Sequence, residues 1–326
     1  MRVLVTGATG FIGGALVERL ADEGVSVRAG HRATSDVRPL DTLGVERAIA
    51  DLDDPRTLRK AVRGCTHVVH LAAVRTRNGF SPAEVARTNV AGTEALARAS
   101  AAEGVERFVF GSTIGVYGFV TRSPVDEATP LRPNSPYRRS KAEAERALRA
   151  VEAETGLPVA IGRICSTVGP GAWGWRPLVR SVRDGSFRLI GDGSNRIHTA
   201  HVSEMADALW RCAVRPQAAG ETVVLGGAAP VSVRAFTGAV ADALGVPRPA
   251  PGPPAAPYVA ACHAASWAFR RTGAFSRWLY AREMLVADKW ADTAKARTRL
   301  GVAPTWAAED AVSDMVGAFV AADALR

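Results

Sequence analysis

The stretch Met1–Gly13 reads MRVLVTGATGFIG and decides the fold of the first half of the chain. A short apolar run, Val3–Val5, precedes Gly7, Gly10 and Gly13, and the next residues are apolar at helical spacing. This order predicts a strand, a tight turn and a helix. Glycines let the backbone approach phosphate groups, and the free N–H groups at a helix start face their negative charge. The stretch therefore predicts a site for a dinucleotide pyrophosphate, although an ordinary glycine-rich turn could show the same spacing.

The composition is that of a folded α/β protein. The 326 residues are 47% hydrophobic, enough for one large domain or for a domain with a smaller lobe. No leader-like segment precedes the first strand, and the longest apolar stretch, Ala255–Phe269, is too short to span a bilayer and contains Pro257 and His263. We therefore expect a cytoplasmic protein without a membrane partner. Four widely spaced cysteines argue against a disulfide framework and a metal site: Cys65, Cys165, Cys212 and Cys262.

The net charge is +9, but no run of five or more basic residues occurs. Nucleic-acid binding requires a basic patch or stripe, so no nucleic-acid partner is expected. The charge suits a nucleotide cofactor and a phosphorylated small-molecule substrate. Only four of the 41 basic residues are lysines, so a lysine at a motif position is informative.

Strands and helices alternate through the first half of the chain. Beyond the first unit, the expected strands are Val25–Ala29, Ala48–Leu52, His67–Ala72, Arg107–Gly111 and Pro158–Arg163, and the expected helices include Pro82–Ala102 and Pro136–Thr155. Such repeated units imply a parallel sheet with helices on both faces. The predicted fold class is therefore α/β, with a doubly wound (Rossmann) parallel sheet over residues 1–168.

The regular alternation weakens after Gly169. Residues 169–326 are expected to form a smaller, mostly helical substrate lobe, with segments around 200–226 returning to the first domain. Pro247–Pro257 is rich in proline and predicts an extended surface linker.

The end of the second strand bears on the choice of cofactor. Val25–Ala29 runs into Gly30, His31 and Arg32, with no carboxylate where one would accept the ribose 2′-hydroxyl of NAD. Arg32, or less favourably Arg28, could pair with the 2′-phosphate of NADP. NADP is therefore preferred over NAD, unless both arginines are only solvated surface residues.

A Tyr-x-x-x-Lys pair stands at the start of a predicted helix. Ser135 suits the cap and Pro136 the first turn, so Tyr137 and Lys141 lie one turn apart on the same face. A phenol is a poor base at neutral pH, but a nearby ammonium and an oxidised nicotinamide favour the phenolate. We expect Tyr137 to act as general acid/base and Lys141 to tune it. The alternative is an exposed helix pair without a catalytic role.

Taken together, these motifs resemble those of the extended short-chain dehydrogenases/reductases, the NAD-dependent epimerase/dehydratase family. The matching pieces are Thr6–Gly13 (TGATGFIG), Asp51-Leu52, His70–Ala73 (HLAA), Asn89, Ser112-Thr113, Val116–Gly118, Ser135–Lys141 (SPYRRSK) and Gly191–Gly193 followed by Arg196, His201 and Val202. They occur in the order that the family has and cover roughly residues 1–213. The resemblance implies an enzyme that transfers hydride between a nicotinamide cofactor and a secondary alcohol or ketone.

The resemblance also implies roles for individual residues. With Arg32 from the argument above, the expected cofactor-binding residues are Gly7, Thr9, Gly10, Phe11, Ile12, Gly13, Arg32, Asp51, Leu52, Leu71, Ala72, Ala73, Asn89, Tyr137 and Lys141. Thr113, or Ser112 in its place, would hydrogen-bond the substrate oxygen, because a hydroxyl can both donate and accept. Catalysis would then rest on Thr113, Tyr137 and Lys141.

Two departures from the family pattern narrow the reaction. Sugar-nucleotide 4,6-dehydratases carry Asp-Glu after the threonine, whereas this chain has Ile114 and Gly115, which cannot move a proton. Dehydration is therefore not expected. Related epimerases tend to have an asparagine at the position of Ser166, which would contact substrate here, and Arg196 could meet a substrate diphosphate or be an exposed loop arginine.

The favoured function is a nucleotide-sugar reductase or 4-epimerase that works as a homodimer. A reductase or dehydrogenase of a hydrophobic ketone or alcohol is the alternative, in which four tryptophans would line an apolar pocket: Trp173, Trp175, Trp267 and Trp290. A non-catalytic NADP-binding sensor is a third possibility, but such a protein could lose the tyrosine or the lysine, and this chain has both.

Overall fold

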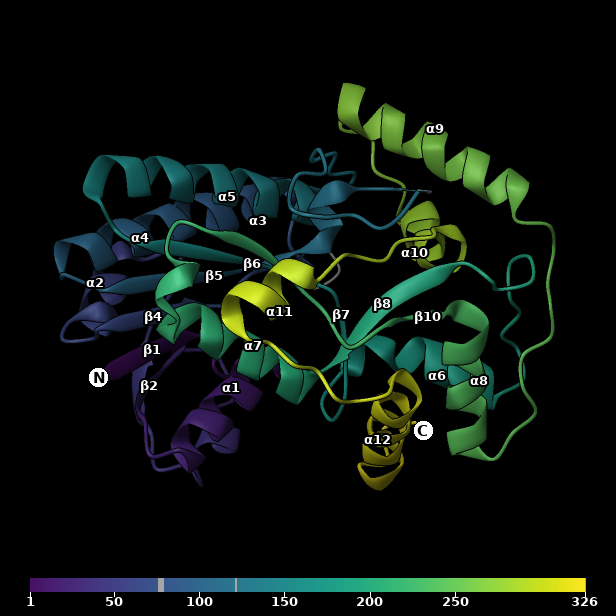
Figure 1. The fold of residues 1–326 in the computed structure, drawn as a ribbon, viewed down its shortest axis with the longest axis horizontal. Coiled ribbons are helices and arrows are strands. Elements are labelled where there is room, and N and C mark those ends of the chain that lie inside the picture. The colour runs from purple at the N-terminus through teal and green to yellow at the C-terminus, as the bar shows by residue number, and fades with distance from the viewer. Residues whose placement is uncertain (76–78, 121, 326) are drawn as a thin grey trace.

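A seven-stranded parallel sheet forms the main body of the molecule (Figure 1). The computed structural model describes residues 1–75, 79–120 and 122–325. In spatial order the strands are β3 (Glu46–Ile49), β2 (Ser26–His31), β1 (Arg2–Thr6), β4 (His67–His70), β5 (Arg107–Thr113), β6 (Val159–Ile164) and β9 (Thr222–Leu225). All neighbouring pairs are parallel, so the carboxyl ends of the strands meet at one edge. The predicted doubly wound fold is confirmed.

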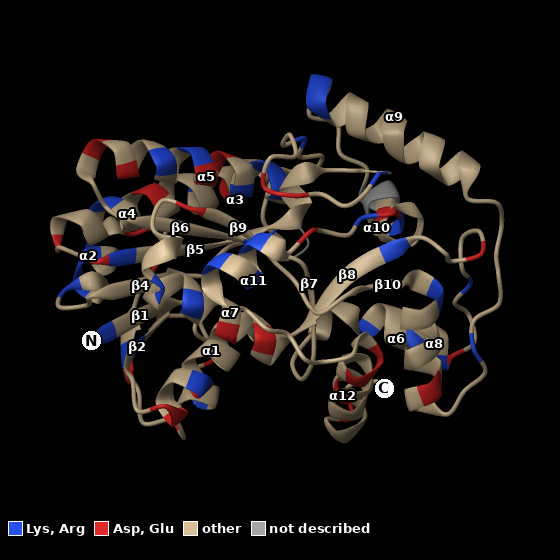
Figure 2. Ribbon diagram, in the orientation of Figure 1, with Lys and Arg blue, Asp and Glu red and all other residues tan. Residues whose placement is uncertain are grey.

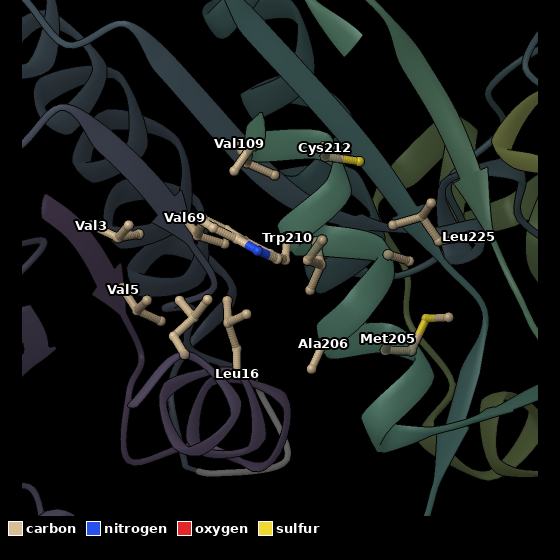
Figure 3. Close-up of a cluster of buried hydrophobic side chains, with 14 of the residues drawn as sticks. Val3, Val5, Leu16, Val69, Val109, Met205, Ala206, Trp210, Cys212 and Leu225 are labelled. Atoms are coloured by element: carbon tan, nitrogen blue, oxygen red, sulfur yellow. The ribbon is translucent and has the colours of Figure 1, made fainter. Parts of the chain in front are cut away.

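Helices cover both faces of this sheet. One face carries α1 (Phe11–Asp22), α7 (Val202–Val214) and α11 (Ala294–Leu300), and the other carries α2 (Pro55–Val62), α4 (Gly92–Ala102) and α5 (Pro136–Thr155). Figure 3 shows the first face, where Leu16 of α1 and Met205 of α7 share a buried cluster with Val5 and Val69 of the sheet. Because both sides are covered, every residue of β4 and β6 is buried.

A second lobe surrounds a three-stranded sheet of β7 (Ser166–Val168), β8 (Arg196–His201) and β10 (Pro230–Ser232). Its core includes residues of α6 (Arg176–Arg183), α8 (Val233–Leu244) and α12 (Ala308–Ala321). The helices α9 (Ala256–Thr272) and α10 (Arg277–Val286) lie further out (Figure 1). Two elements from within residues 200–226 return to the main sheet: α7 packs on its face, and β9 is its last strand.

Charged residues of both signs alternate on α2, α4 and α5 (Figure 2). Among the residues that the structure describes, no helix is long and apolar enough to cross a membrane. The four cysteines are buried.

The helix predicted over Pro82–Ala102 is interrupted. Instead of one helix, α3 (Pro82–Ala86) runs into a π-helical turn, η3 (Arg87–Ala91), before α4 begins. The cause is tertiary, because the side chain of Asn89 within this turn bonds to the loop after β4. Such π-helical turns within helices often occur at functional sites.

Other expected boundaries also differ from the structure. β3 spans Glu46–Ile49 rather than Ala48–Leu52. The Pro247–Pro257 segment is not a free linker, because its backbone bonds to the 189–191 segment and its last residues already belong to α9.

Candidate active site

The glycine loop lies pressed between β1 and the end of β4. Gly7 has a φ of +71°, and a Cβ there would lie 2.8 Å from the backbone nitrogen of Ala72. A Cβ on Gly13 would collide with the carbonyl oxygen of Gly7. Gly10 begins α1 without any side chain that caps it. The backbone N–H groups of this turn can therefore meet phosphate oxygens, so the loop fits a dinucleotide pyrophosphate.

The other residues predicted to bind the cofactor around this loop lie in different surroundings. Thr9 lies in the turn, and Ile12 packs on the core cluster of the main sheet. Phe11 packs against the core of the second lobe, so the first turn of α1 joins the two lobes. Leu71 and Ala73 follow β4 at the carboxyl edge of the sheet, beside Ala72.

The two arginines considered for a 2′-phosphate have different surroundings. Arg32 is exposed just beyond β2, where its backbone nitrogen donates to Ser35 Oγ. Arg28 is buried and donates to the Glu46 carboxylate and to the carbonyl oxygen of Ala61. Arg28 is therefore a structural residue, which corrects its inclusion as a phosphate candidate. The reason is that a sheet covered on both faces buries side chains of either direction.

The predicted adenine contacts lie beyond β3. The Asp51 carboxylate accepts from the backbone nitrogen of Asp53, and the backbone nitrogen of Asp51 donates to Thr57 Oγ1. Leu52 is buried against Gly92, where a Cβ would lie 2.6 Å from Leu52 Cβ. Asp51 is half-buried at the sheet edge, where its position is compatible with the predicted contact.

Asn89 braces the site. Its Nδ2 donates to the Val74 carbonyl oxygen at 2.9 Å and to Ser140 Oγ at 3.0 Å, and its Oδ1 accepts from the Val74 nitrogen at 2.8 Å. Ser140 Oγ in turn donates to the carbonyl oxygen of Tyr137. These bonds tie the loop after β4 to α5. Asn89 is therefore a positioning residue, and its contact with the cofactor stays a prediction.

Tyr137 and Lys141 stand where the sequence predicts them. Ser135 caps α5 by accepting from the Arg138 backbone nitrogen, and Pro136 is the first residue of the helix. The Lys141 side chain is buried, and its Nζ donates to the Gly111 carbonyl oxygen at 2.7 Å. Burial lowers the pKa of the Lys141 ammonium, whereas the nearby Tyr137 raises it. The helix therefore holds the ammonium at the end of β5, with Tyr137 near it.

The structure distinguishes the two candidate hydroxyls at the end of β5. Ser112 is buried and donates to the Glu145 carboxylate, which removes it from the site. Thr113 is half-buried, and its Oγ1 accepts from the Gly115 nitrogen at 3.0 Å at the start of η4 (Ile114–Tyr117). Its hydroxyl proton remains able to donate to a substrate oxygen. Thr113 is therefore the better placed of the two.

Sequence reasoning missed Arg75, which lies beside Tyr137. Its Nη2 donates to Tyr137 Oη at 3.4 Å, and its guanidinium lies 4.5 Å from the ring centroid. A second cation besides Lys141 therefore lies next to the phenol of Tyr137. No sequence signal separates Arg75 from the many other arginines, because its loop approaches α5 only in the folded chain.

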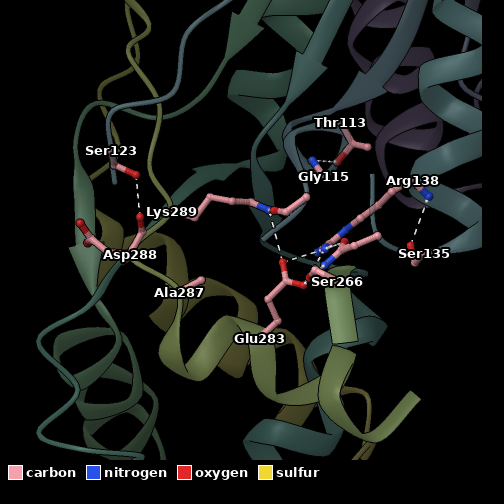
Figure 4. A network of polar contacts seen from close by, with 12 residues as sticks. Thr113, Gly115, Ser123, Ser135, Arg138, Ser266, Glu283, Ala287, Asp288 and Lys289 are labelled. Atoms are coloured by element: carbon pink, nitrogen blue, oxygen red, sulfur yellow. Dashed lines mark hydrogen bonds and ion pairs between the residues drawn. The ribbon is translucent and has the colours of Figure 1, made fainter. Parts of the chain in front are cut away.

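A buried charge network, also missed, borders the site (Figure 4). Arg138 Nη1 donates to both Glu283 oxygens, at 2.7 and 2.8 Å, and Lys289 Nζ lies 3.4 Å from Glu283 Oε1. Although burial opposes ionisation, Arg138 and Lys289 hold the pKa of Glu283 at about 2. Burial and the neighbouring Arg138 lower the pKa of Lys289 to about 8. The network ties α10 to the first turn of α5.

This network explains one departure from the dehydratase pattern. A Cβ on Gly115 would lie 3.0 Å from both Cγ and Nε of Arg138. Ile114, the preceding residue, is buried and apolar. The space next to Thr113 is thus taken by an arginine side chain where the dehydratases have an acid/base pair.

The predicted substrate residues lie in the second lobe. Ser166 is half-buried on β7, opposite Thr199 of β8. Arg196 begins β8, and its Nε and Nη2 donate to the Asp288 carboxylate at 3.2 and 3.1 Å. Its guanidinium also lies 4.7 Å from the Trp290 ring centroid. Arg196 is therefore exposed, as one alternative expected, but it is the first residue of β8 rather than a loop residue, and it is paired with Asp288.

The four tryptophans do not share one pocket wall. Trp173 stacks on Phe319, and Trp175 packs on Phe236 in the core of the second lobe. Trp267 is 57% exposed on the outside of α9. The indoles lie in different surroundings, so the structure gives no support to a cavity lined by all four tryptophans.

Known proteins with similar sequences include enzymes that act on nucleotide sugars or oxo compounds, and one is a sterol demethylase protein. Residues 3–226 match the model of the NAD-dependent epimerase/dehydratase family. A dTDP-glucose 4,6-dehydratase of Streptomyces antibioticus is 34% identical over 76% of this chain and 78% of its own length. The 2-alkyl-3-oxoalkanoate reductase of Stenotrophomonas maltophilia is 33% identical over 76% of this chain and 77% of its own length. Sterol demethylase protein B of Methylococcus capsulatus is 38% identical, but the match spans only 56% of this chain and 57% of that protein.

Solved structures give the same result over nearly the whole chain. The crystal structure of gox2253 has a TM-score of 0.84 at 28% identity and covers 98% of both chains. MoeE5, solved in complex with UDP-glucose and NAD, has a TM-score of 0.76 at 27% identity and covers 99% of both. The chain therefore belongs to the NAD-dependent epimerase/dehydratase family and is an enzyme of the short-chain dehydrogenase/reductase type.

Proposed function

We propose that the protein transfers hydride at a secondary alcohol or ketone, with Tyr137 exchanging the proton. The observation that carries this proposal is the placement of Tyr137 and Lys141 on α5, with Lys141 Nζ bonded to the end of β5. The glycine loop lies at the same carboxyl edge of the sheet, where ligands bind in doubly wound folds. A bound nicotinamide dinucleotide supplies or takes the hydride.

The residues of this chain hold the reacting oxygen and move its proton. In the reducing direction, the carbonyl carbon gains a hydride and its oxygen takes the proton of Tyr137 Oη. Thr113 Oγ1 donates to the same oxygen and orients it. Lys141 and Arg75 stabilise the phenolate that results, which then recovers a proton from solvent. The reverse sequence oxidises the alcohol.

NADP is the proposed cofactor. Arg32 is exposed beyond β2, and the Asp36 carboxylate in the same loop already accepts from the Arg38 side chain, which lowers the pKa of Asp36 to about 2. This arrangement favours a 2′-phosphate over a free 2′-hydroxyl. Related structures were solved with NAD, so the preference for NADP rests on Arg32 alone. Relative kcat/KM values with NADPH and NADH test it.

A nucleotide-linked sugar is the proposed substrate, with reduction or 4-epimerisation as the reaction. Its support is the similarity to the dTDP-glucose 4,6-dehydratase and to MoeE5 with bound UDP-glucose. Ser166 and Arg196 would contact the sugar and the diphosphate. Dehydration is not proposed, because Ile114 and Gly115 supply no acid or base.

A hydrophobic ketone is the second candidate. It is favoured by the similarity to the 2-alkyl-3-oxoalkanoate reductase and to a farnesyl-dihydroquinoline oxide ketoreductase of Stigmatella aurantiaca, which is 30% identical over 76% of this chain. The apolar Ile114 and the engaged Arg196 suit such a substrate as well.

A substrate panel separates these candidates. Sugar nucleotides and 3-oxo lipids are offered with NADPH and NADH, and the absorbance of the reduced nicotinamide is followed. Because a 4-epimerase shows no net change in that absorbance, product sugars are also separated by chromatography. Turnover of a sugar nucleotide is expected, and turnover of only the 3-oxo lipids would reverse the order of the candidates. A homodimer remains a prediction that light scattering checks, and a cytoplasmic location remains one that cell fractionation checks.

A further inference from the structure

The helices α9 and α10 lie on the outside of the molecule (Figure 1). Both expose apolar or aromatic side chains. α9 buries Cys262, Ser266 and Phe269 against the body. Its outer side carries exposed Ala260, Ala264 and Trp267. Residues 256–269 contain no charged side chain, whereas an ordinary surface helix turns charged and polar side chains outward.

Each of the two helices presents an indole flanked by an arginine. Trp267 of α9 is 57% exposed and Trp278 of α10 is 54% exposed. The Arg271 guanidinium lies 5.8 Å from the first ring centroid, and that of Arg282 lies 3.8 Å from the second. Exposed indoles next to cations are typical of side chains at the boundary between lipid and water.

The charge of this region has one sign. Residues 249–282 contain four arginines and no Asp or Glu: Arg270, Arg271, Arg277 and Arg282. Figure 2 shows α9 almost free of charge except at its C-terminal end, where Arg270 and Arg271 lie in the last turn. The next acidic residue, Glu283, is buried and paired with Arg138, so it does not offset these cations at the surface.

We propose that α9 and α10 together form a docking face for an anionic membrane surface. The apolar side of α9 and the two indoles would enter the headgroup region, and Arg270, Arg271 and Arg282 would pair with lipid phosphates. Opposite charge and exposed indoles favour this occupant over a second copy of the chain, whose same face would be equally basic. The sequence-based expectation of no membrane partner rested on the lack of a spanning segment, which surface docking does not need.

Docking would bring the site close to the bilayer. Arg139 Nη2, in the first turn of α5, donates to the Phe269 carbonyl oxygen at 3.1 Å, and its guanidinium lies 4.3 Å from the Phe269 ring. Arg138 bonds to Glu283 of α10. The docking face is thus tied to the turn that carries Tyr137. Vesicle binding is measured without any enzymatic turnover. A failure of the docking proposal is therefore distinguishable from a failure of the proposed enzymatic function.

The test is co-sedimentation of the full chain with vesicles of phosphatidylglycerol and phosphatidylcholine, or of phosphatidylcholine alone. We expect binding to the anionic vesicles only, weakened by salt. Arg270→Gln/Arg271→Gln should lower the partition coefficient roughly thirtyfold, at about fivefold for each arginine. Trp267→Ala should weaken binding at any salt concentration, and circular dichroism checks that each variant is folded.

The matched control is Arg59→Gln/Lys60→Gln, which removes the same charge from the last turn of α2 at the far end of the molecule (Figure 1). It should bind like the wild type. Three results would overturn the proposal: no binding to anionic vesicles at low salt, an equal loss in the control, or a dimer that Trp267→Ala dissociates while no vesicles are bound.

Discussion

Replacing Lys141 by methionine removes the cation that the account places beside Tyr137. The two side chains are one helical turn apart, which corresponds to about 5–6 Å between Cβ atoms. At that distance a unit charge stabilises a phenolate by about 3 kcal/mol with an effective dielectric constant of about 20. The expected loss in kcat/KM is therefore about a hundredfold. The fold should tolerate the change, since methionine avoids the cost of burying an ammonium.

The assay is kcat/KM for alcohol oxidation from pH 6 to pH 10, with the substrate that the panel identifies. Loss of the ammonium should also move the midpoint of the rising limb up by about two pH units. Lys295→Met is the control, because Lys295 Nζ likewise donates to a backbone carbonyl oxygen, that of Thr222, but lies on α11. An unchanged rate and profile in Lys141→Met, or an equal loss in the control, would refute the reasoning.

Further predictions concern the loop, the charge network and the cofactor. Gly13→Ala should abolish detectable NADPH binding in calorimetry, because the added Cβ collides with the loop backbone. Glu283→Gln should lower the free energy of unfolding by about 3 kcal/mol at pH 7 in urea titrations, since Arg138 loses a buried partner. Because the folded-state pKa of Glu283 is depressed to about 2, this difference should be complete above its unfolded pKa of about 4.3 and should shrink as the pH falls toward 2. Arg75→Met should lower kcat/KM about tenfold more than Arg75→Lys, as the steady-state assay measures. Arg32→Ser should raise the KM for NADPH about tenfold and leave that for NADH unchanged, and equal effects on both would remove its proposed role.

The sequence was sufficient for the features set by local chemistry. The Gly7–Gly13 spacing specifies a strand, a turn and a helix within one short stretch, and the Ser135-Pro136 start puts Tyr137 and Lys141 on one face of α5. Both depend on neighbours in the chain, so both could be predicted without tertiary information.

Other features depend on contacts between distant segments. The π-helical turn at Arg87–Ala91 arises from bonds between Asn89 and the loop after β4. Arg75 and Glu283 join the site through tertiary contacts with the start of α5. Periodicity predicts which face of a helix is apolar, but it does not predict which distant charge lies opposite.

The most direct test of the claim that Tyr137 exchanges the proton is to measure both kcat/KM and the affinity for NADPH in Tyr137→Phe. The phenol is the proton donor, so the account predicts a loss of at least about a hundredfold in kcat/KM, with NADPH affinity close to that of the wild type. Tyr117→Phe is the matched control, since that tyrosine is fully buried against Arg163 and burial raises its pKa to about 12. Activity of Tyr137→Phe within a few-fold of the wild type would contradict the account.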